Sequence, residues 1–215
     1  MAANIATARQ GAKVLGLAPV DVRNFKDMQA AADECAKELG GIDFVIAGAA
    51  GNFLASIKEL SANAFKSVMD IDVLGSYNAF KATASYLADS AAKCREKKQP
   101  SPSTGGRIIF ISATMHYTGA PFQTHVVAAK AGVDALSNNI AIEYGPLGVT
   151  SNIIAPGPIQ GTEGVDRLFP SNSRESSIRS QPLGRYGSVT DIADATVYLF
   201  SKTGSYVTGA KLVGE

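Results

Sequence analysis

The stretch at residues 123–162 constrains the fold more than any other part of the chain. Apolar residues recur every three or four positions over 126–144, which predicts an amphipathic helix. Glycine and proline at 145–148 end that helix, and the β-branched run at 149–157 predicts a buried parallel strand. A helix, a turn, a strand and a loop in this order form half of a doubly wound α/β unit. Ligands bind where such strands open into loops, so residues 156–162 are a candidate site.

The rest of the chain alternates apolar strands with helical patterns. Residues that cap helix N-termini precede three further helical patterns, at Asn24, Ser61 and Thr190. Residues 158–189 are irregular and rich in Gly, Pro, Ser and Arg, which predicts a substrate loop or lid. We therefore expect a single α/β domain over residues 1–215 with a doubly wound parallel sheet. Its five strands are predicted at residues 12–21, 42–51, 106–113, 149–157 and 205–213.

Composition and charge argue against several classes of protein. Hydrophobic residues make up 46% of the chain and charged residues 18%, which is typical of a globular domain. A net charge of +1 argues against a nucleic-acid partner, which requires a basic surface. No apolar run reaches the length of a membrane span, and the N-terminus lacks the apolar core of a signal peptide. Cys35 and Cys94 have no metal-binding spacing and form no disulfide framework, which favours a reducing or neutral compartment with no metal site.

Four short motifs follow one another in a characteristic order. They are Asp-Val-Arg at 21–23, Ala-Gly-Ala-Ala-Gly at 47–51, Asp-Val-Leu-Gly at 72–75, and Pro-Gly with a later threonine at 156–162. Their order and spacing resemble those of the short-chain dehydrogenases/reductases over nearly the whole chain. The resemblance implies a Rossmann-like fold and a nicotinamide cofactor.

Within that family the motifs are similar to those of the peroxisomal 2,4-dienoyl-CoA reductases. The shared features are AAGNFL at 49–54, MDID at 69–72, a histidine five residues before the lysine (His125 and Lys130), and PGPI-x-GTEG at 156–164. Most short-chain enzymes carry a proton-donating tyrosine and a serine, but those positions here hold Val126 and Ala113. A dienoyl thioester does not need that donor. Hydride adds to its δ-carbon, the negative charge spreads to the thioester oxygen, and a water can protonate the α-carbon.

The resemblance implies an enzyme that uses NADPH to reduce a 2,4-dienoyl-CoA to a 3-enoyl-CoA in the β-oxidation of unsaturated fatty acids. It implies catalytic roles for Asp72 and Lys130. Implied cofactor contacts are Asp21, Ala49, Lys130, Pro156, Gly157, Pro158, Ile159 and Thr162. Implied substrate contacts are Arg23, Phe53, Ser61, Ala62, Asn63 and Arg167. The implied partners are a fatty acyl-CoA and further copies of the chain, as a homo-oligomer (dimer or tetramer). The implied location is the peroxisome, and otherwise the cytoplasm.

The residues alone leave the role of Asp72 open. Helical spacing places it on the face of Phe65 and Met69, so we expect its carboxylate to point inward, where it needs a partner. Lys130 is the natural partner. The two form either a catalytic pair or a structural ion pair, and the alternative is an exposed aspartate. A lone histidine near a helix start is usually a satisfied polar residue, so His125 is not assigned to catalysis.

Two features of the family are missing from this sequence. No strand, glycine-rich turn and helix precede residue 12 to receive a pyrophosphate, so we expect the sheet to lack the family's first two strands and NADPH to bind weakly. Three explanations for the missing strands stay open: the chain is a fragment, it pairs with another chain, or its sheet is rearranged.

Residues 210–212 spell Ala-Lys-Leu but do not end the chain, so they give no terminal targeting signal. Two other functions stay open: another short-chain enoyl or keto reductase, and a catalytically silent binding or assembly protein.

Overall fold

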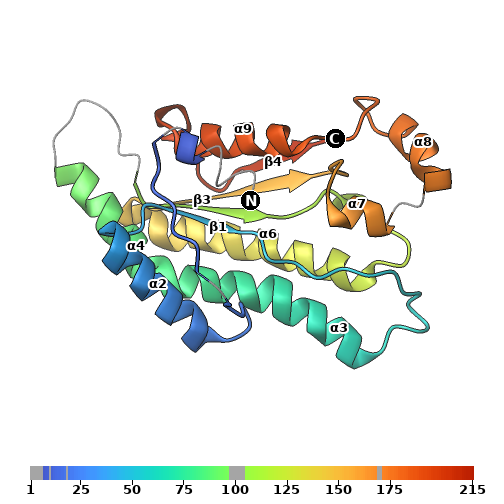
Figure 1. Ribbon diagram of the computed structural model, residues 1–215, viewed down its shortest axis with the longest axis horizontal. Coiled ribbons are helices and arrows are strands. Elements are labelled where there is room, and N and C mark those ends of the chain that lie inside the picture. The colour runs from blue at the N-terminus through green and yellow to red at the C-terminus, as the bar shows by residue number, and fades with distance from the viewer. Residues whose placement is uncertain (1–6, 10, 18, 97–104, 169–170) are drawn as a thin grey trace.

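Four parallel strands form the centre of the computed structural model, which describes residues 7–9, 11–17, 19–96, 105–168 and 171–215. Their order across the sheet follows the sequence, from β1 through β2 and β3 to β4 (Figure 1). Each strand pairs in parallel with the next, so their carboxyl ends lie along one edge of the sheet. The strands span Phe44–Ala47 (β1), Arg107–Ile111 (β2), Thr150–Pro156 (β3) and Lys211–Gly214 (β4). The predicted parallel α/β sheet is therefore confirmed.

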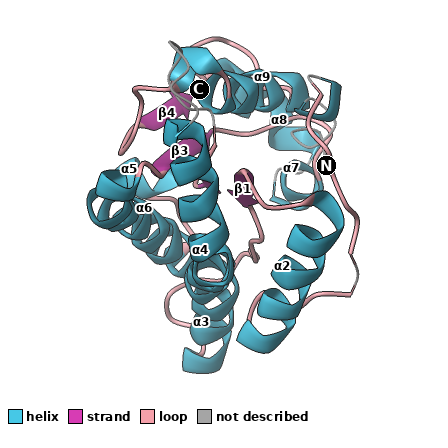
Figure 2. Cartoon of the chain, turned by 90° about the vertical axis from the view of Figure 1, so that its left-hand side faces the viewer, coloured by secondary structure: helices cyan, strands magenta, loops and turns pink. Residues whose placement is uncertain are grey.

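Helices cover both faces of the sheet, which is the doubly wound arrangement (Figure 2). Helices α4 and α6 pack on one face, with α2 against α4, and α9 lies on the other. Alternate residues of β2 point to opposite faces. Ile108 and Phe110 join the core with α4 and α6, whereas Ile109 packs with Leu199 of α9. These helices span Phe25–Leu39 (α2), Gly75–Glu96 (α4), Thr124–Tyr144 (α6) and Val189–Phe200 (α9).

Two of the three predicted helix caps are confirmed. The side chain of Asn24 accepts a backbone N–H at the start of α2 at 3.0 Å, and Ser61 does the same for α3 (Ala62–Met69) at 3.2 Å. The third prediction is wrong by two residues, because Ser188 and not Thr190 caps α9. Asp191 completes the capping box by accepting the backbone N–H of Ser188.

The predicted strand at residues 12–21 is wrong. None of its described residues belongs to a strand, and β1 is the edge of the sheet on that side. A strand exists only where a neighbouring backbone accepts and donates its hydrogen bonds, so β-branched sequence is not sufficient. The sheet therefore has four strands within the described residues, and the strand predicted at residues 12–21 is not one of them.

The predicted irregularity of residues 158–189 is also wrong in part. Two short helices occupy this region, α7 (Glu163–Leu168) and α8 (Ser171–Arg179). Ion pairs four residues apart support them, between Arg167 and Glu163 at 3.1 Å in α7 and between Arg179 and Glu175 in α8. The described residues of α8 bury no apolar stripe, so the periodicity that reveals most helices is missing. The role of this region as a lid stays a prediction.

The predicted long helix after Ser61 is interrupted at the segment that contains Asp72. Helix α3 passes into one turn of π-helix, η1 (Asp70–Leu74), before α4 begins. A π-turn inserts an extra residue, rotates the side chains that follow it, and often marks a functional site. Asp72 lies at the middle of this turn.

The remaining elements are short. No helix in the described part of the chain is long and apolar enough to cross a bilayer. The short helices span Met115–Thr118 (α5), Gly145–Leu147 (η2) and Lys202–Gly204 (η3).

Candidate active site

Asp72 and Lys130 face each other at the carboxyl edge of the sheet. Asp72 is fully buried, and its Oδ2 lies 3.1 Å from the Nζ of Lys130, which is 6% exposed. The other carboxylate oxygen, Oδ1, accepts the backbone N–H of Gly51 at 2.7 Å. The π-turn carries the aspartate and α6 carries the lysine, so two elements far apart in sequence build the pair. Of the arrangements that the sequence left open for Asp72, the exposed one is excluded.

Lys130 is held by the sheet as well as by Asp72. Its Nζ donates to the backbone carbonyl of Ile111 at 3.1 Å, at the end of β2. The ammonium therefore has two fixed oxygen neighbours at a position where parallel strands open into loops. A buried ammonium and carboxylate in this geometry are each stable only in the presence of the other.

The segment after β1 is fastened between Asp72 and the start of α6. Asn52 donates from Nδ2 to the Oε1 of Gln123 at 2.7 Å. The ring of Phe53 stacks on the imidazole of His125, with 4.2 Å between the centroids and 27° between the planes. His125 is fully buried, and burial lowers the pKa of its imidazole, which is therefore neutral at pH 7. The nearby Phe53 backbone and the charge of Asp72 oppose that shift more weakly.

Apolar side chains fill the position where most family members carry a phenol. Val126 is buried together with Val68 and Ala129, and the half-buried Phe53 and Met115 pack against them. None of these side chains can donate a proton. The ionisable groups of the pair beside this position are therefore the carboxylate of Asp72 and the ammonium of Lys130.

The loop after β3 is fixed on both sides. The backbone N–H of Gly157 donates to the carbonyl of Gly214 in β4 at 2.6 Å, and Ile159 bridges to Gly187. The hydroxyl of Thr162 donates to the carbonyl of Ile159 at 2.7 Å. A pocket of about 150 Å³ lies beside this loop, between it and the start of α9. Backbone and side-chain hydrogen bonds thus hold the predicted cofactor loop in place at the carboxyl edge of the sheet.

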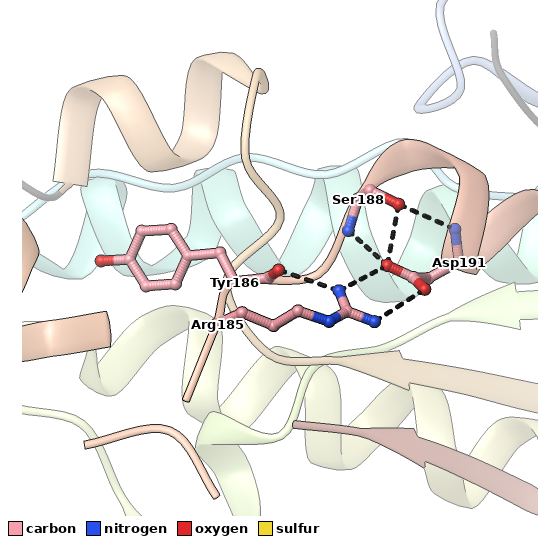
Figure 3. A network of polar contacts seen from close by, with 4 residues as sticks. All are labelled: Arg185, Tyr186, Ser188 and Asp191. Atoms are coloured by element: carbon pink, nitrogen blue, oxygen red, sulfur yellow. Dashed lines mark hydrogen bonds and ion pairs between the residues drawn. The ribbon is translucent and has the colours of Figure 1, made fainter. Parts of the chain in front are cut away.

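A polar network holds residues 185–191, the segment that is hydrogen-bonded to the loop after β3 (Figure 3). Arg185 pairs with Asp191 through two nitrogens, at 2.9 and 3.0 Å, and also donates to the carbonyl of Tyr186 at 3.0 Å. The Arg185 guanidinium, with hydrogen bonds from Ser188, holds the pKa of Asp191 far below its usual range. The network therefore fixes Gly187 beside the loop, whose Pro158 carbonyl accepts the Gly187 N–H at 3.0 Å.

Asp134, on α6, is a second buried carboxylate that the sequence did not reveal. It accepts from the Nε2 of His116 at 2.9 Å and the hydroxyl of Tyr117 at 3.0 Å, and it pairs with the Nζ of Lys211 at 3.1 Å. Burial raises its pKa, but hydrogen bonds from Ser112, Lys211 and Tyr117 outweigh burial and lower it overall. Burial and the bond to Asp134 raise the pKa of Tyr117 to about 12. These contacts fasten α5 and β4 to α6.

Most of the predicted substrate residues make local contacts only, within the described chain. Arg23 pairs with Asp21 at 2.7 Å, which lowers the pKa of Asp21 to about 2, and Arg167 pairs with Glu163 within α7. The exposed residues Ser61, Ala62 and Asn63 form the start of α3. Only Phe53 is joined to the ion-pair region by a described contact, its stack on His125.

Two residues that the sequence missed act through their backbones. The N–H of Gly51 and the carbonyl of Ile111 hold the ion pair, and a backbone group has no signature in sequence. Asn52 lies within the AAGNFL motif but was not singled out. Its amide in a glycine-containing loop after a strand was the one available signal.

The nicotinamide end of a dinucleotide fits this edge of the sheet. Ala49 and Ala50 follow β1 and are exposed, the ammonium of Lys130 lies at the end of β2 and can bind a ribose hydroxyl, and residues 156–162 follow β3, so all three lie at the carboxyl ends of parallel strands. The diphosphate end has no matching feature in the described residues. No glycine-rich turn between a strand and a helix precedes β1 there.

Comparison with known proteins agrees with this geometry. A family model described as Enoyl-(Acyl carrier protein) reductase matches residues 2–214. The chain is 52% identical over 200 residues to a peroxisomal 2,4-dienoyl-CoA reductase of Saccharomyces cerevisiae named as (3E)-enoyl-CoA-producing, covering 93% of this chain and 64% of that protein. It is 42% identical to the peroxisomal enzyme of the same name from Danio rerio, covering 100% and 67%.

A solved structure of a short chain dehydrogenase also resembles the chain. The crystal structure of a short chain dehydrogenase from Bacillus anthracis matches with a TM-score of 0.75 and 32% identity, over 90% of this chain and 71% of that chain. The chain thus spans about two thirds of the length of the curated relatives that it matches. With a family model over nearly all of its residues and a parallel sheet that carries an aspartate–lysine pair at its carboxyl edge, the chain belongs to the short-chain dehydrogenase/reductase family.

Proposed function

We propose that the chain carries the catalytic residues of an NADPH-dependent reductase that converts 2,4-dienoyl-CoA to 3-enoyl-CoA. The observation that carries the proposal is the buried pair of Asp72 and Lys130, 3.1 Å apart, where Val126 replaces the proton-donating phenol. A keto reductase needs that phenol to protonate an alkoxide, whereas a dienoyl thioester does not. The names of the matching relatives from Saccharomyces cerevisiae and Danio rerio support the same reaction.

The residues of this chain divide the work by charge. When bound, the reduced nicotinamide supplies the hydride that adds to the δ-carbon of the dienoyl thioester. The ammonium of Lys130 stabilises the negative charge that develops along the conjugated system. The carboxylate of Asp72 holds that ammonium and accepts a hydrogen bond from a water, which delivers the proton to the α-carbon.

Substrate binding is assigned to residues around this edge. The half-buried ring of Phe53 offers a flat apolar wall to the acyl chain. Arg23 and Arg167 carry exposed guanidinium groups, which pair with the phosphates of coenzyme A by bidentate hydrogen bonds once they leave Asp21 and Glu163. Ser61 to Asn63 at the exposed start of α3 complete the proposed contacts.

The setting of the reaction is proposed from the same relatives. Their names place them in the peroxisome, and we propose that location and a role in β-oxidation of unsaturated fatty acids. We also propose a homo-oligomer, dimer or tetramer. Leu74 at the end of η1, Tyr77 on α4 and Ile142 on α6 are exposed apolar side chains that a second copy would cover.

The test is loss of NADPH absorbance with a 2,4-dienoyl-CoA. Lys130→Ala and Asp72→Ala should each abolish turnover, and Lys66→Ala, in an exposed pair with Asp70, should leave it unchanged. A parent chain without turnover would refute the reductase. It would support a silent binding or assembly protein instead.

A further inference from the structure

Some of the buried polar atoms without a hydrogen-bond partner belong to Asp72 of the ion pair and to two residues linked to it through the segment after β1. In the described chain they include the Oδ1 of Asn52, the Oδ2 of Asp72 and both ring nitrogens of His125. The Oδ2 of Asp72 has its ion-pair contact with Lys130 but no well-directed hydrogen bond. Leaving such atoms unpaired in the interior is unfavourable, so a group of them in one place indicates a polar guest.

Hydrogen bonds and a ring stack connect these three residues through the segment after β1. The N–H of Gly51 binds Asp72, Asn52 binds Gln123, and the ring of Phe53 stacks on His125. The charge of Asp72 also reaches the imidazole of His125, because it opposes the lowering of the histidine pKa. Asp72 and His125 therefore flank the same segment.

The balance of donors and acceptors identifies the guest. The Oδ1 of Asn52 and the Oδ2 of Asp72 can only accept hydrogen bonds. A neutral His125 offers one donor and one acceptor, and the Phe53 backbone, whose hydrogen bond opposes the lowering of the histidine pKa, competes for that donor, so acceptors outnumber donors. A carbonyl or phosphate oxygen would leave those acceptors unpaired. Water, which donates two hydrogen bonds and accepts others, satisfies them.

We propose that His125 is a positioning residue that, with Asp72, orients the water that protonates the α-carbon, and so determines that a 3-enoyl product forms. This inference rests on the proposed function. After hydride forms the new C–H bond at the δ-carbon, the dienolate can accept a proton at the α-carbon, giving a 3-enoyl thioester, or at the γ-carbon, giving a 2-enoyl thioester. The water loses one proton to the α-carbon, and the resulting hydroxide takes a proton from the Lys130 ammonium, which solvent then restores. His125 stays neutral throughout.

The test compares the products of His125→Phe and the parent chain. Phenylalanine keeps a flat ring against Phe53 and removes both nitrogens. We expect kcat to fall on the order of tenfold with little change in KM, and 2-enoyl-CoA to appear among the products. His125→Gln, which retains a donor and an acceptor, should restore the 3-enoyl product. His116→Phe, the same change at the histidine that pairs with Asp134, should not alter the product ratio.

The outcomes separate the two proposals. If His125→Phe turns over substrate with the parent's kcat and product ratio, this inference is wrong and the proposed function stands. If the parent chain does not turn over at all, the proposed function fails, and NMR of ¹⁵N-histidine-labelled chain still decides on His125. We expect a neutral ring with a slowly exchanging N–H and magnetisation transfer from a bound water. A charged ring, or a ring without contact to water, overturns the inference.

Discussion

Lys130→Met tests the ion pair by its effect on stability. Methionine retains the length and much of the volume of lysine but removes the ammonium. The carboxylate of Asp72, which is fully buried, would then keep only the N–H of Gly51 as a partner. Removing one member of a buried pair leaves an uncompensated charge, at a cost of about 3–5 kcal/mol in the free energy of unfolding.

A second variant separates the pair from simple loss of packing. Lys130→Met leaves the buried charge of Asp72 unpaired, and Asp72→Asn removes that charge. The double variant should therefore recover a large part of the stability lost in Lys130→Met. We expect a coupling free energy of about 2–3 kcal/mol between the two positions, because residues in direct contact do not act additively. The exposed pair of Lys66 and Asp70 is the matched control, and Lys66→Met should cost about 0.3–0.5 kcal/mol.

Urea unfolding of the single and double variants, followed by circular dichroism, measures these differences. Additive effects of Lys130→Met and Asp72→Asn would refute the reasoning, because two side chains that do not interact in the folded protein are additive. A loss for Lys130→Met no larger than that for Lys66→Met would refute it as well.

Three further predictions concern other parts of the structure. Arg23→Gln should raise the pKa of Asp21 from about 2 toward its ordinary 3.8, as followed by NMR of the carboxyl carbon; the stability that this depressed pKa contributes is present above pH 3.8 and is lost as the pH falls toward 2. Asp134→Asn should lower the pKa of Tyr117 from about 12, because a negative hydrogen-bond partner disappears, and phenolate absorbance measures that shift. Gly106→Ala should destabilise by about 2–4 kcal/mol in urea unfolding, because φ is 71° and a Cβ would lie 2.6 Å from the Leu87 carbonyl.

Each of these has an internal control. Gly145→Ala, at a negative φ with no atom within 4 Å of the added Cβ, should cost far less than Gly106→Ala, and equal costs would contradict the packing argument. An unchanged pKa of Asp21 in Arg23→Gln would show that the pair does not persist in solution. Tyr117 should keep its raised pKa in Lys66→Ala, far from Asp134.

Apolar periodicity was sufficient to predict the main elements. Helices α2 and α6 and strands β2 and β3 lie within a few residues of their predicted bounds, because each buries a face or a whole strand in the core. The meeting of Asp72 with Lys130 was also predictable, since an inward carboxylate needs a cation.

The rest depends on information that local sequence does not contain. Residues 12–21 have strand sequence but no neighbouring strand, and pairing is a property of the whole sheet. The π-turn at Asp70–Leu74 packs against α6, which lies far along the chain, so regular helical spacing did not reveal it. The partners of the ion pair are backbone groups of Gly51 and Ile111, which only the fold brings near.

The most direct test of the active-site assignment is the turnover of Asp72→Asn with NADPH and a 2,4-dienoyl-CoA. Asparagine keeps the shape of the side chain and its bond to the Gly51 N–H, and removes only the charge that faces Lys130. Because the proposal places the pair at the catalytic centre, we expect kcat to fall by about a hundredfold or more. The circular dichroism spectrum should show an unchanged fold. A variant that turns over substrate at the parent's rate would contradict the assignment.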